Sequence, residues 1–513
     1  MAISPLKERQ NKTQSMLYDM NKHICRIFFV ILFTAAFYGE AAAQSQNAQD
    51  LGTLSLDQCI NIAQDQSSVA KAARYALISS KWQYKSFQAD LLPSLSFSGE
   101  APNYGRTFTK DYVNGKTNYF YQTQSETSVQ MAIDQNILPT GGTLSLSSGI
   151  ARDGIFFGED TYLWRSTPLV LGLSQPLFQF NSLKWRNRTE PLQYQIAKKQ
   201  YVEDMEDISL TVAQRFFGVY LAKINLQNAK FNVTRNDSIY QISKGRYNVG
   251  SIAENDLLQT ELALRNAESA LTSAQIEYNR QLNEFKIFLG YPTDVKLNLK
   301  EPKRLPKISV DIEKAKQLAL KNNSESLTYR LNEIQANRDL AQAQSGARFN
   351  ATLNINYGLN QTSQQLSGLY KNPKNQQFIN VGFNVPIFNW GKERAQINAA
   401  KNQQREVANN IQYQRREFLQ QVDYNVSQFL QLRQQVLLAA KADTIAQRRY
   451  QVAQNRYLIG KIDITNLFIA QNEKDQARQA YIRALRTFWT GLYQLRKLTL
   501  FDFKDDKPIT YDL

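Results

Sequence analysis

The second half of this chain repeats its first half. Residues 246–252, Arg-Tyr-Asn-Val-Gly-Ser-Ile, return as residues 456–462, Arg-Tyr-Leu-Ile-Gly-Lys-Ile, at an offset of 210 residues. A Pro-x-Phe triplet at Pro176 returns at Pro386 with the same offset. Two separate markers that share one offset indicate an internal duplication. The chain must therefore build two similar structural units.

A third marker has a different offset. At Pro93, and again at Phe349, a helical pattern gives way to an alternating one, and these positions lie 256 residues apart. The excess of 46 residues over the first offset predicts an insertion in the first unit, between Pro93 and Pro176.

The N-terminus has the pattern of an export signal, predicted over residues 1–43. Lys22 and Arg26 precede a mainly apolar run at 27–37, and three alanines, 41–43, give a small-residue cleavage site. The alternative is a transmembrane anchor. The apolar run is too short for it, because a spanning helix needs roughly 20 residues.

Composition argues against catalysis. Cleavage would remove His23, the only histidine, and leave one cysteine, Cys59, so histidine general-base chemistry and disulfides are excluded. No paired acidic motif, phosphate loop or nucleophile elbow occurs. We expect no enzyme activity, no catalytic residue, no metal and no cofactor.

The net charge of +16 is compatible with nucleic-acid binding. The basic residues, however, are scattered among Gln, Asn and Ala in long helical stretches, with no recognition motif. A solvated helical surface is the better interpretation, and no nucleic-acid partner is expected.

Two stretches are too long and too poor in helix breakers for ordinary globular helices. Residues 192–244 contain no proline and one glycine, and residues 392–459 contain neither. At 1.5 Å per residue they would be roughly 80–100 Å long, so each must pack along another helix. Return helices at 254–289 and 464–497 follow Gly250 and Gly460, which predicts two helical hairpins.

Between the helices lie segments of period two, apolar on one face and polar on the other. The first unit is predicted to have four strands, 93–103, 126–138, 142–152 and 167–178, with long loops at 104–125 and 153–166. The second unit adds two strands within 349–388. A soluble sandwich would bury the apolar face in a core. A transmembrane barrel would turn it toward lipid, and flanking aromatic residues favour the barrel.

The predicted organisation follows from these boundaries. It comprises a signal peptide (1–43), a first repeat (44–290; strands 93–178, hairpin 187–290), a linker (291–312), a second repeat (313–499; strands 349–388, hairpin 392–497) and a C-terminal tail (500–513).

This order of elements, with the Pro-x-Phe strand exits and the Arg-Tyr-x-x-Gly hairpins, resembles the TolC-like outer-membrane efflux proteins over nearly all of the chain after the signal. The resemblance implies an α+β fold: an outer-membrane β-barrel, in contact with lipid, continuous with a long periplasmic α-helical barrel. Three protomers would form one tube, with an equatorial belt built by the linker and the tail. Typical members have four strands per protomer and twelve per trimer. The insertion is a departure that predicts six strands per protomer here and eighteen in the homotrimer, and the choice between twelve and eighteen is left open.

The resemblance also implies a function. The trimer would be a passive exit duct of a tripartite efflux or type I secretion system. It would dock a periplasmic adaptor at its tips and reach an inner-membrane pump through that adaptor. The substrate, whether drug, metal ion or polypeptide, is left open. The alternative is a structural periplasmic coiled coil or a surface adhesin; the alternating strands and the lack of a sustained heptad or lipid anchor argue against it.

In the family the Arg-Tyr-x-x-Gly turns meet the adaptor. Carried over, the candidate partner-binding residues are Arg246, Tyr247, Val249, Gly250, Ser251, Arg456, Tyr457, Ile459, Gly460 and Lys461. The alternative is that Arg and Tyr only cap and pack the turn.

The family's constricting carboxylates correspond here to Asn466 and Ile469, so that acidic gate is not retained. The remaining candidates for the gate are Asp256 and Asp463, or an apolar constriction by Phe468 or Ile469.

Overall fold

The computed structural model describes residues 50–113, 116–157, 159–301 and 305–511, and the expected signal peptide lies outside these ranges. The chain divides into two units, Met1–Gly52 with Asp294–Lys296, and Thr53–Thr293 with Leu297–Leu513. Two short strands, β1 (Asp50–Leu54) and β6 (Lys296–Leu299), pair with each other. All further elements belong to the second unit.

The duplication is visible in four pairs of helices of equal length. They have 11, 22, 67 and 36 residues in each copy. The first copy contains α2 (Leu56–Gln66), α3 (Ser68–Ala89), α4 (Ser182–Asn248) and α5 (Glu254–Leu289). The second contains α6 (Ile312–Asn322), α7 (Glu325–Gly346), α8 (Lys392–Leu458) and α9 (Ile464–Thr499).

Helix α4 begins earlier than the sequence predicts. The Asn181 side chain accepts a hydrogen bond from the Lys184 N–H at 2.9 Å, and the helix continues through Pro191. A good N-cap fixes the start of a helix. Helices α4 and α8 are each about 100 Å long at 1.5 Å per residue. None of the described helices is both long and apolar enough to cross a membrane.

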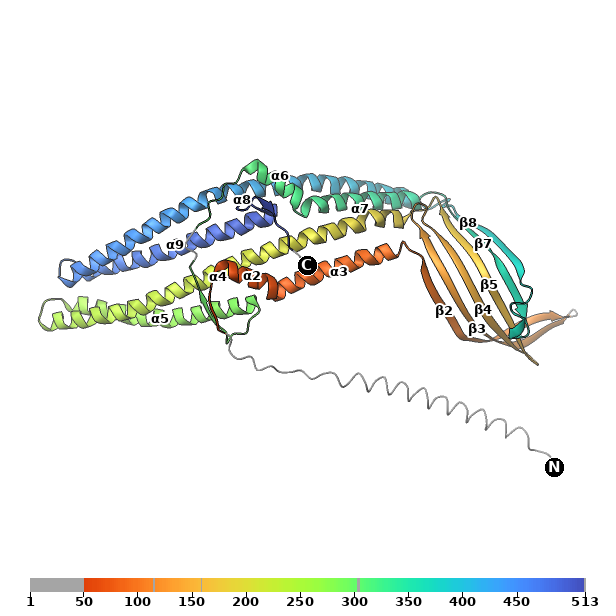
Figure 1. Cartoon of the computed structure of the whole chain (residues 1–513), viewed down its shortest axis with the longest axis horizontal. Helices are drawn as coiled ribbons and strands as arrows, with labels where there is room; N and C mark the ends of the chain where they lie inside the picture. The colour runs from red at the N-terminus through yellow and green to blue at the C-terminus, as the bar shows by residue number, and fades with distance from the viewer. Residues whose placement is uncertain (1–49, 114–115, 158, 302–304, 512–513) are drawn as a thin grey trace, which may run out of the picture. The chain divides into compact units, whose positions relative to one another are not determined.

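The six long strands form one antiparallel sheet in the order β2-β3-β4-β5-β7-β8. The strands are β2 (Ser94–Val113), β3 (Lys116–Ile137), β4 (Gly142–Phe157), β5 (Glu159–Leu177), β7 (Asn350–Ser363) and β8 (Lys374–Asn384). The predicted count of six strands is confirmed. Within the second unit, the sheet lies at one end of the helices and the two hairpin turns lie at the other (Figure 1).

The predicted long loops at 104–125 and 153–166 are wrong. β2 and β3 stay paired out to Val113 and Lys116, and β4 and β5 out to Phe157 and Glu159. These segments are polar and aromatic, so they do not show the hydrophobic alternation used to find strands. Their Thr and Tyr residues nevertheless favour strands, and the ladder pairs their backbone groups.

The apolar face of the sheet is exposed. The register places Phe97 opposite Met131, and Leu353 opposite Val381, on one face. Phe97 is 71% exposed, and no described element covers it. A soluble sandwich would bury this face, so that interpretation is wrong. The short strands β9 (Phe501–Asp502) and β10 (Lys507–Pro508) and the 3-10 turn η1 (Leu366–Gly368) complete the fold.

The core lies among the helices near the middle of α4. Helix α4 contacts α5, α9, α3 and α2, and it buries Phe216 and Phe217 completely. Phe216 packs edge-on against Phe285 of α5, with 6.4 Å between ring centroids. This aromatic packing joins the two helices of the first hairpin.

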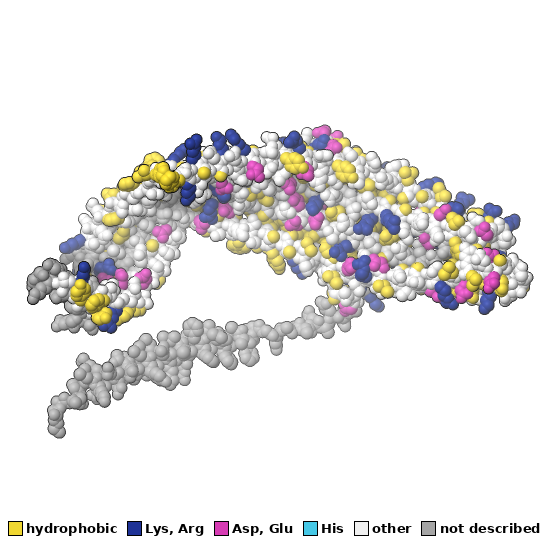
Figure 2. Space-filling view, turned by 180° about the vertical axis from the view of Figure 1, so that it is seen from behind, with side chains coloured by type: hydrophobic (Ala, Val, Ile, Leu, Met, Phe, Trp, Pro, Cys, Tyr) yellow, Lys and Arg dark blue, Asp and Glu magenta, His cyan; other side chains and the backbone are white. Residues whose placement is uncertain are grey.

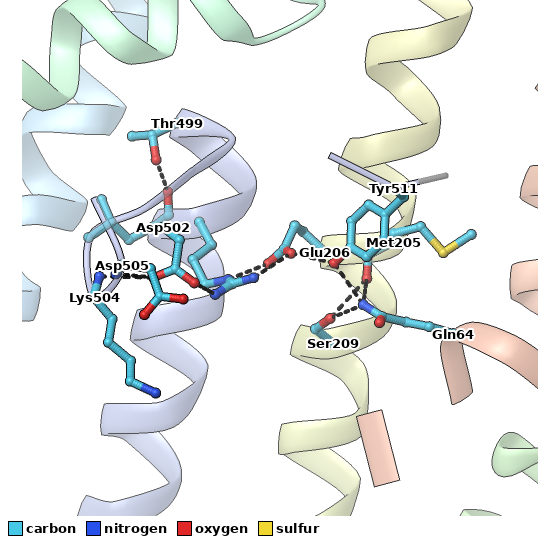
Figure 3. Close-up of polar contacts among 11 residues, drawn as sticks. Gln64, Met205, Glu206, Ser209, Thr499, Asp502, Lys504, Asp505 and Tyr511 are labelled. Carbon is cyan, nitrogen blue, oxygen red and sulfur yellow. Dashed lines mark hydrogen bonds and ion pairs between the residues drawn. The ribbon is translucent and has the colours of Figure 1, made fainter. Parts of the chain in front are cut away.

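A buried polar cluster holds the C-terminal tail on α4. Arg496 of α9 donates to both carboxylate oxygens of Glu206 at 2.8 and 3.0 Å, and it also pairs with Asp502. The Tyr511 hydroxyl donates to Glu206 at 2.6 Å, and Gln64 of α2 donates to Tyr511 at 2.8 Å (Figure 3). Glu206 is fully buried, so its charge depends on these donors.

Candidate partner-binding tips

The two hairpin turns have the same backbone geometry. At the end of α4, the Gly250 N–H donates to the Tyr247 carbonyl at 2.9 Å, and the Ser251 N–H donates to the Arg246 carbonyl at 2.8 Å. At the end of α8, Gly460 and Lys461 make the same two bonds with the same lengths. This is the Schellman motif, which satisfies the last carbonyls of a helix.

The motif explains why glycine occupies both turns. Gly250 has φ +72° and Gly460 has φ +75°, in the left-handed region. A Cβ atom on either residue would meet nothing within 4 Å. The glycines are therefore required by their own backbone conformation and not by the close approach of a neighbour.

Each turn exposes an apolar side chain beside polar or basic ones. Val249 is 75% exposed and Ile459 is 66% exposed, at equivalent positions. In the first turn, Tyr247 and Ser251 are also exposed; in the second, Arg456 and Lys461 are exposed. One exposed apolar side chain per turn is ordinary on a protein surface, so the tips stay candidates by their matching geometry.

Tyr457 differs from its counterpart Tyr247. It is only 5% exposed, against 40% for Tyr247, and it packs in a cluster at the tips. Its hydroxyl lies 3.3 Å from the Ser243 hydroxyl. The cluster contains the buried residues Ile239, Tyr450, Tyr457, Ile464 and Leu467. Tyr457 therefore packs the turn, as the alternative interpretation had it, and its contact with a partner stays a prediction.

Arg246 links the two hairpins. It donates to the Leu458 carbonyl at 3.3 Å, and its guanidinium lies 5.4 Å from the centre of the Tyr457 ring. The sequence did not predict this contact or the role of Ser243. The only local signal for Ser243 is its position one helical turn before Tyr247, on the same helix face.

Two of the five candidate gate residues, Asp256 and Asp463, line a cavity of about 500 Å³ between the two tips. Asp256 is half-buried in the first turn of α5 and lines the cavity together with Asp463. Phe468 is half-buried against the tip cluster, whereas Asn466 and Ile469 are exposed. The structure thus brings Arg246, Asp256, Tyr457 and Asp463 together across the two hairpins.

Asp463 has a structural role that the sequence analysis did not foresee. As the N-cap of α9, it accepts from the Asn466 N–H at 2.7 Å and from the Asn466 side chain at 3.1 Å. The equivalent N-cap of α5 is Ala253, which has no side-chain cap. Within the described ranges, no group of three or more His, Cys, Asp or Glu residues could hold a metal ion.

The model of the outer membrane efflux protein family matches residues 60–290 and 317–499, which is most of the chain. The chain belongs to this family. The two matched segments coincide with the two helix–strand–hairpin copies, and the TolC-like resemblance is confirmed. The protein is thus an efflux channel of the outer membrane, and its helical part lies in the periplasm.

Solved structures with the same fold include outer membrane channels. The outer membrane channel CmeC of Campylobacter jejuni is 18% identical, covering 89% of this chain and 87% of its own, with a TM-score of 0.64. VceC of Vibrio cholerae is 13% identical, covering 86% and 95%, with a TM-score of 0.61. The open state of MtrE of Neisseria gonorrhoeae is 16% identical, covering 86% and 88%, with a TM-score of 0.57. No curated protein has significant sequence similarity to this family member.

Proposed function

We propose that this family member is one protomer of a homotrimeric exit duct, docked at its periplasmic tips to an adaptor protein and through it to an inner-membrane pump. The duct is passive and holds no catalytic residue or cofactor, and the pump selects the substrate. The observation that carries the proposal is a sheet with an exposed apolar face and two free edges, continuous with 67-residue helices.

The free edges support closure by three copies. Among the described strands, β2 and β8 each pair on one side only. A long unpaired edge is a liability that a closed barrel removes. Three sheets of six strands would close into eighteen, a size that leaves an aqueous channel. The exposed apolar face would then contact lipid.

Helix α8 offers a surface for the neighbouring protomer. Four of its exposed apolar residues, each at least half exposed, share one seven-residue register: Tyr424, Leu438, Ile445 and Val452. The C-cap Ile459 continues this register, whereas Tyr413, Leu437 and Leu458 are as exposed but lie outside it. A seven-residue repeat is the spacing of a seam between packed helices. This seven-residue repeat is hard to see in the sequence, because apolar residues that the protomer buries in its own core lie between its members.

The tips support adaptor docking. Both turns present an apolar side chain, Val249 or Ile459, on a backbone fixed by the same two hydrogen bonds. Partners of this kind bind exposed apolar groups surrounded by polar ones. On the face drawn in Figure 2, Lys and Arg side chains are spread along the helices and do not gather in one patch, which favours a solvated surface over a nucleic-acid site.

Single-channel recording of the purified protein in planar bilayers, with the mass of the detergent-solubilised oligomer, tests the duct. We expect a trimer with discrete openings. A monomer without conductance would favour the structural coiled coil or adhesin, for which the heptad spacing on α8 is the supporting observation. Photo-crosslinkers at Val249 and Ile459 test docking: they should capture the adaptor, whereas one at Tyr413, on α8 far from the tips, should not.

A further inference from the structure

The outer end of the sheet carries a surface that the duct function does not use. Beyond Thr123, strand β3 pairs with β2 alone, so the two strands form a hairpin that extends past β4. A strand that crosses an outer membrane needs about 9–11 residues. β2 and β3 have 20 and 22 residues, so in the proposed barrel their outer arms would extend past the hydrocarbon layer into the headgroup region.

One face of this end is aromatic and basic. In the register, Phe108 lies opposite Tyr121 and Lys110 lies opposite Tyr119, so these four side chains share a face. The Phe108 ring stacks on the Tyr119 ring, with 5.8 Å between ring centroids, and its centroid lies 5.0 Å from that of Tyr121. The guanidinium of Arg106 lies 4.3 Å from the centre of the Tyr121 ring. We call the arginine–aromatic face the surface formed by these residues and a second group on β4 and β5: Arg106, Phe108, Lys110, Tyr119, Tyr121, Arg152, Phe156, Tyr162 and Trp164.

The same arrangement continues on β4 and β5. Arg152 lies 4.0 Å from the ring centre of Tyr162 and 5.5 Å from that of Trp164. Arg152 is opposite Trp164 in the register, and Phe156 packs edge-on against Tyr162 at 5.9 Å. Two separate arginines therefore lie on aromatic rings on one side of the sheet.

This face continues the lipid-facing surface. Residues of one parity in a strand share a face. Tyr119 and Tyr121 have the parity of Val129, Met131 and Ile133 in the unbroken strand β3. The arginine–aromatic face is therefore the outward extension of the apolar face, at the level where lipid headgroups begin. This step rests on the proposed barrel, in which the apolar face meets lipid.

The charges on the two faces differ. On the opposite face, Arg165 is paired with Glu126 at 2.8 Å and with Asp153 at 2.6 Å. Among the described side chains, Arg106, Lys110 and Arg152 have no carboxylate partner, and all three are exposed. Three cations that lack a counter-charge among the described side chains, beside stacked aromatic rings, suit a ligand with phosphates and flat sugar faces.

We propose that the arginine–aromatic face binds the phosphorylated inner core of lipopolysaccharide in the outer leaflet. The guanidiniums and the ammonium of Lys110 would pair with phosphate groups, because arginine binds phosphate with two parallel hydrogen bonds. Tyr119, Tyr121 and Tyr162 would contact the sugar rings, as aromatic residues do at membrane–water interfaces.

Binding of lipopolysaccharide truncated to its phosphorylated inner core tests the proposal. The assay uses the full-length trimer in detergent and compares wild type with the triple variant Arg106→Gln, Lys110→Gln, Arg152→Gln. The expected result is a Kd at least about 10-fold higher for the variant, because it loses charge-assisted hydrogen bonds to phosphate. A 10-fold change in Kd corresponds to about 1.4 kcal/mol. The matched control, Lys401→Gln, Arg405→Gln, Lys441→Gln on α8, removes the same charge and should bind as wild type.

Two further arms make the result decisive. Enzymatically dephosphorylated lipopolysaccharide should bind wild type as weakly as the intact form binds the triple variant. Phosphatidylglycerol micelles should compete poorly. Equal binding by both triple variants, or full competition by phosphatidylglycerol, would overturn the proposal. Trimer mass and conductance are measured on the same samples, so a failure of the duct is distinguishable from a failure of this face.

Discussion

At the scale of single residues, two tyrosines at equivalent positions of the Arg-Tyr-x-x-Gly motif have different surroundings. Tyr247 and Tyr457 each lie three residues before a turn glycine, yet only Tyr457 is buried, against Ser243 of the other hairpin. Local sequence fixes the turn, because the glycine and the two hydrogen bonds lie within six residues. It does not fix burial, which depends on the helix that packs alongside.

The turn glycines give the first prediction. Gly250→Ala and Gly460→Ala should each lower the free energy of unfolding by about 1–2 kcal/mol, because a left-handed conformation costs that much for a residue with a Cβ. Urea denaturation measures the change, and hydrogen exchange localises it to the tips. Gly245→Ala is the matched control: Gly245 is helical and open, so alanine there should stabilise the protein by up to about 1 kcal/mol. Equal effects at all three sites would contradict the argument.

Asp502 gives a prediction about pH. Burial opposes its charge, but attraction to Arg496 and the N–H groups of Lys504 and Asp505 hold its pKa below the usual value. A carboxylate with a lowered pKa in the folded state stabilises the fold above its unfolded pKa. That contribution is lost as pH falls through the folded value.

We therefore expect Asp502→Asn to lower the melting temperature at pH 7. The effect should shrink as pH falls through the folded pKa of Asp502, because the wild-type group is then protonated as well. Asp505→Asn is the control, since Asp505 is exposed and pairs only with Lys507 at 3.3 Å. A pH-independent difference between wild type and Asp502→Asn would rule out the carboxylate charge as the cause.

At the scale of elements, the sequence predicted the long helices well and the strands in part. The absence of proline and glycine from residues 392–459 matches α8. The return helices α5 and α9 begin four residues after the turn glycines, at Glu254 and Ile464. The outer arms of β2 and β3 were missed because their pattern is polar and aromatic, and only pairing with a neighbour reveals them. The predicted start of the first hairpin at residue 187 is five residues late, because the N-cap Asn181 sets the start of α4 at Ser182.

The two return helices differ at their N-caps, and this gives a reciprocal prediction. Asp463→Ala should destabilise the protein by about 1 kcal/mol through loss of the α9 cap. Ala253→Asp should stabilise it by a similar amount, because α5 lacks a side-chain cap at the equivalent position. Thermal melting of both variants and of the double variant measures this. Conductance of the Asp463→Ala channel separates the cap from a gate: unaltered openings would leave Asp463 with the structural role alone.

At the scale of the whole molecule, assembly should depend on the exposed apolar series of α8. Ile445→Asp combined with Val452→Asp places two charges in the proposed seam, where burial without a partner is costly. We expect monomers, measured by native mass spectrometry, with the helical content of wild type. Thr444→Asp combined with Gln451→Asp is the control: both residues are exposed, each lies one residue before a seam position and so about 100° round the helix, and the change adds the same two charges, so trimers should still form. Trimers in both double variants would place the protomer contact elsewhere.

The equal helix lengths in the two copies have a consequence for how this chain can change over time. Helices α4 and α8 have 67 residues each, and α5 and α9 have 36 each. A deletion of seven residues from α4 alone would shorten that helix by about 10 Å, at 1.5 Å per residue. The hairpin turn at Gly250 would then no longer lie level with the turn at Gly460, and Arg246 would be separated from Leu458. Any insertion or deletion in one long helix therefore has to be matched in the other three. The distance that the helices reach into the periplasm can therefore change only when all four long helices change together. Two helix lengths, each present in both copies, keep the two tips level.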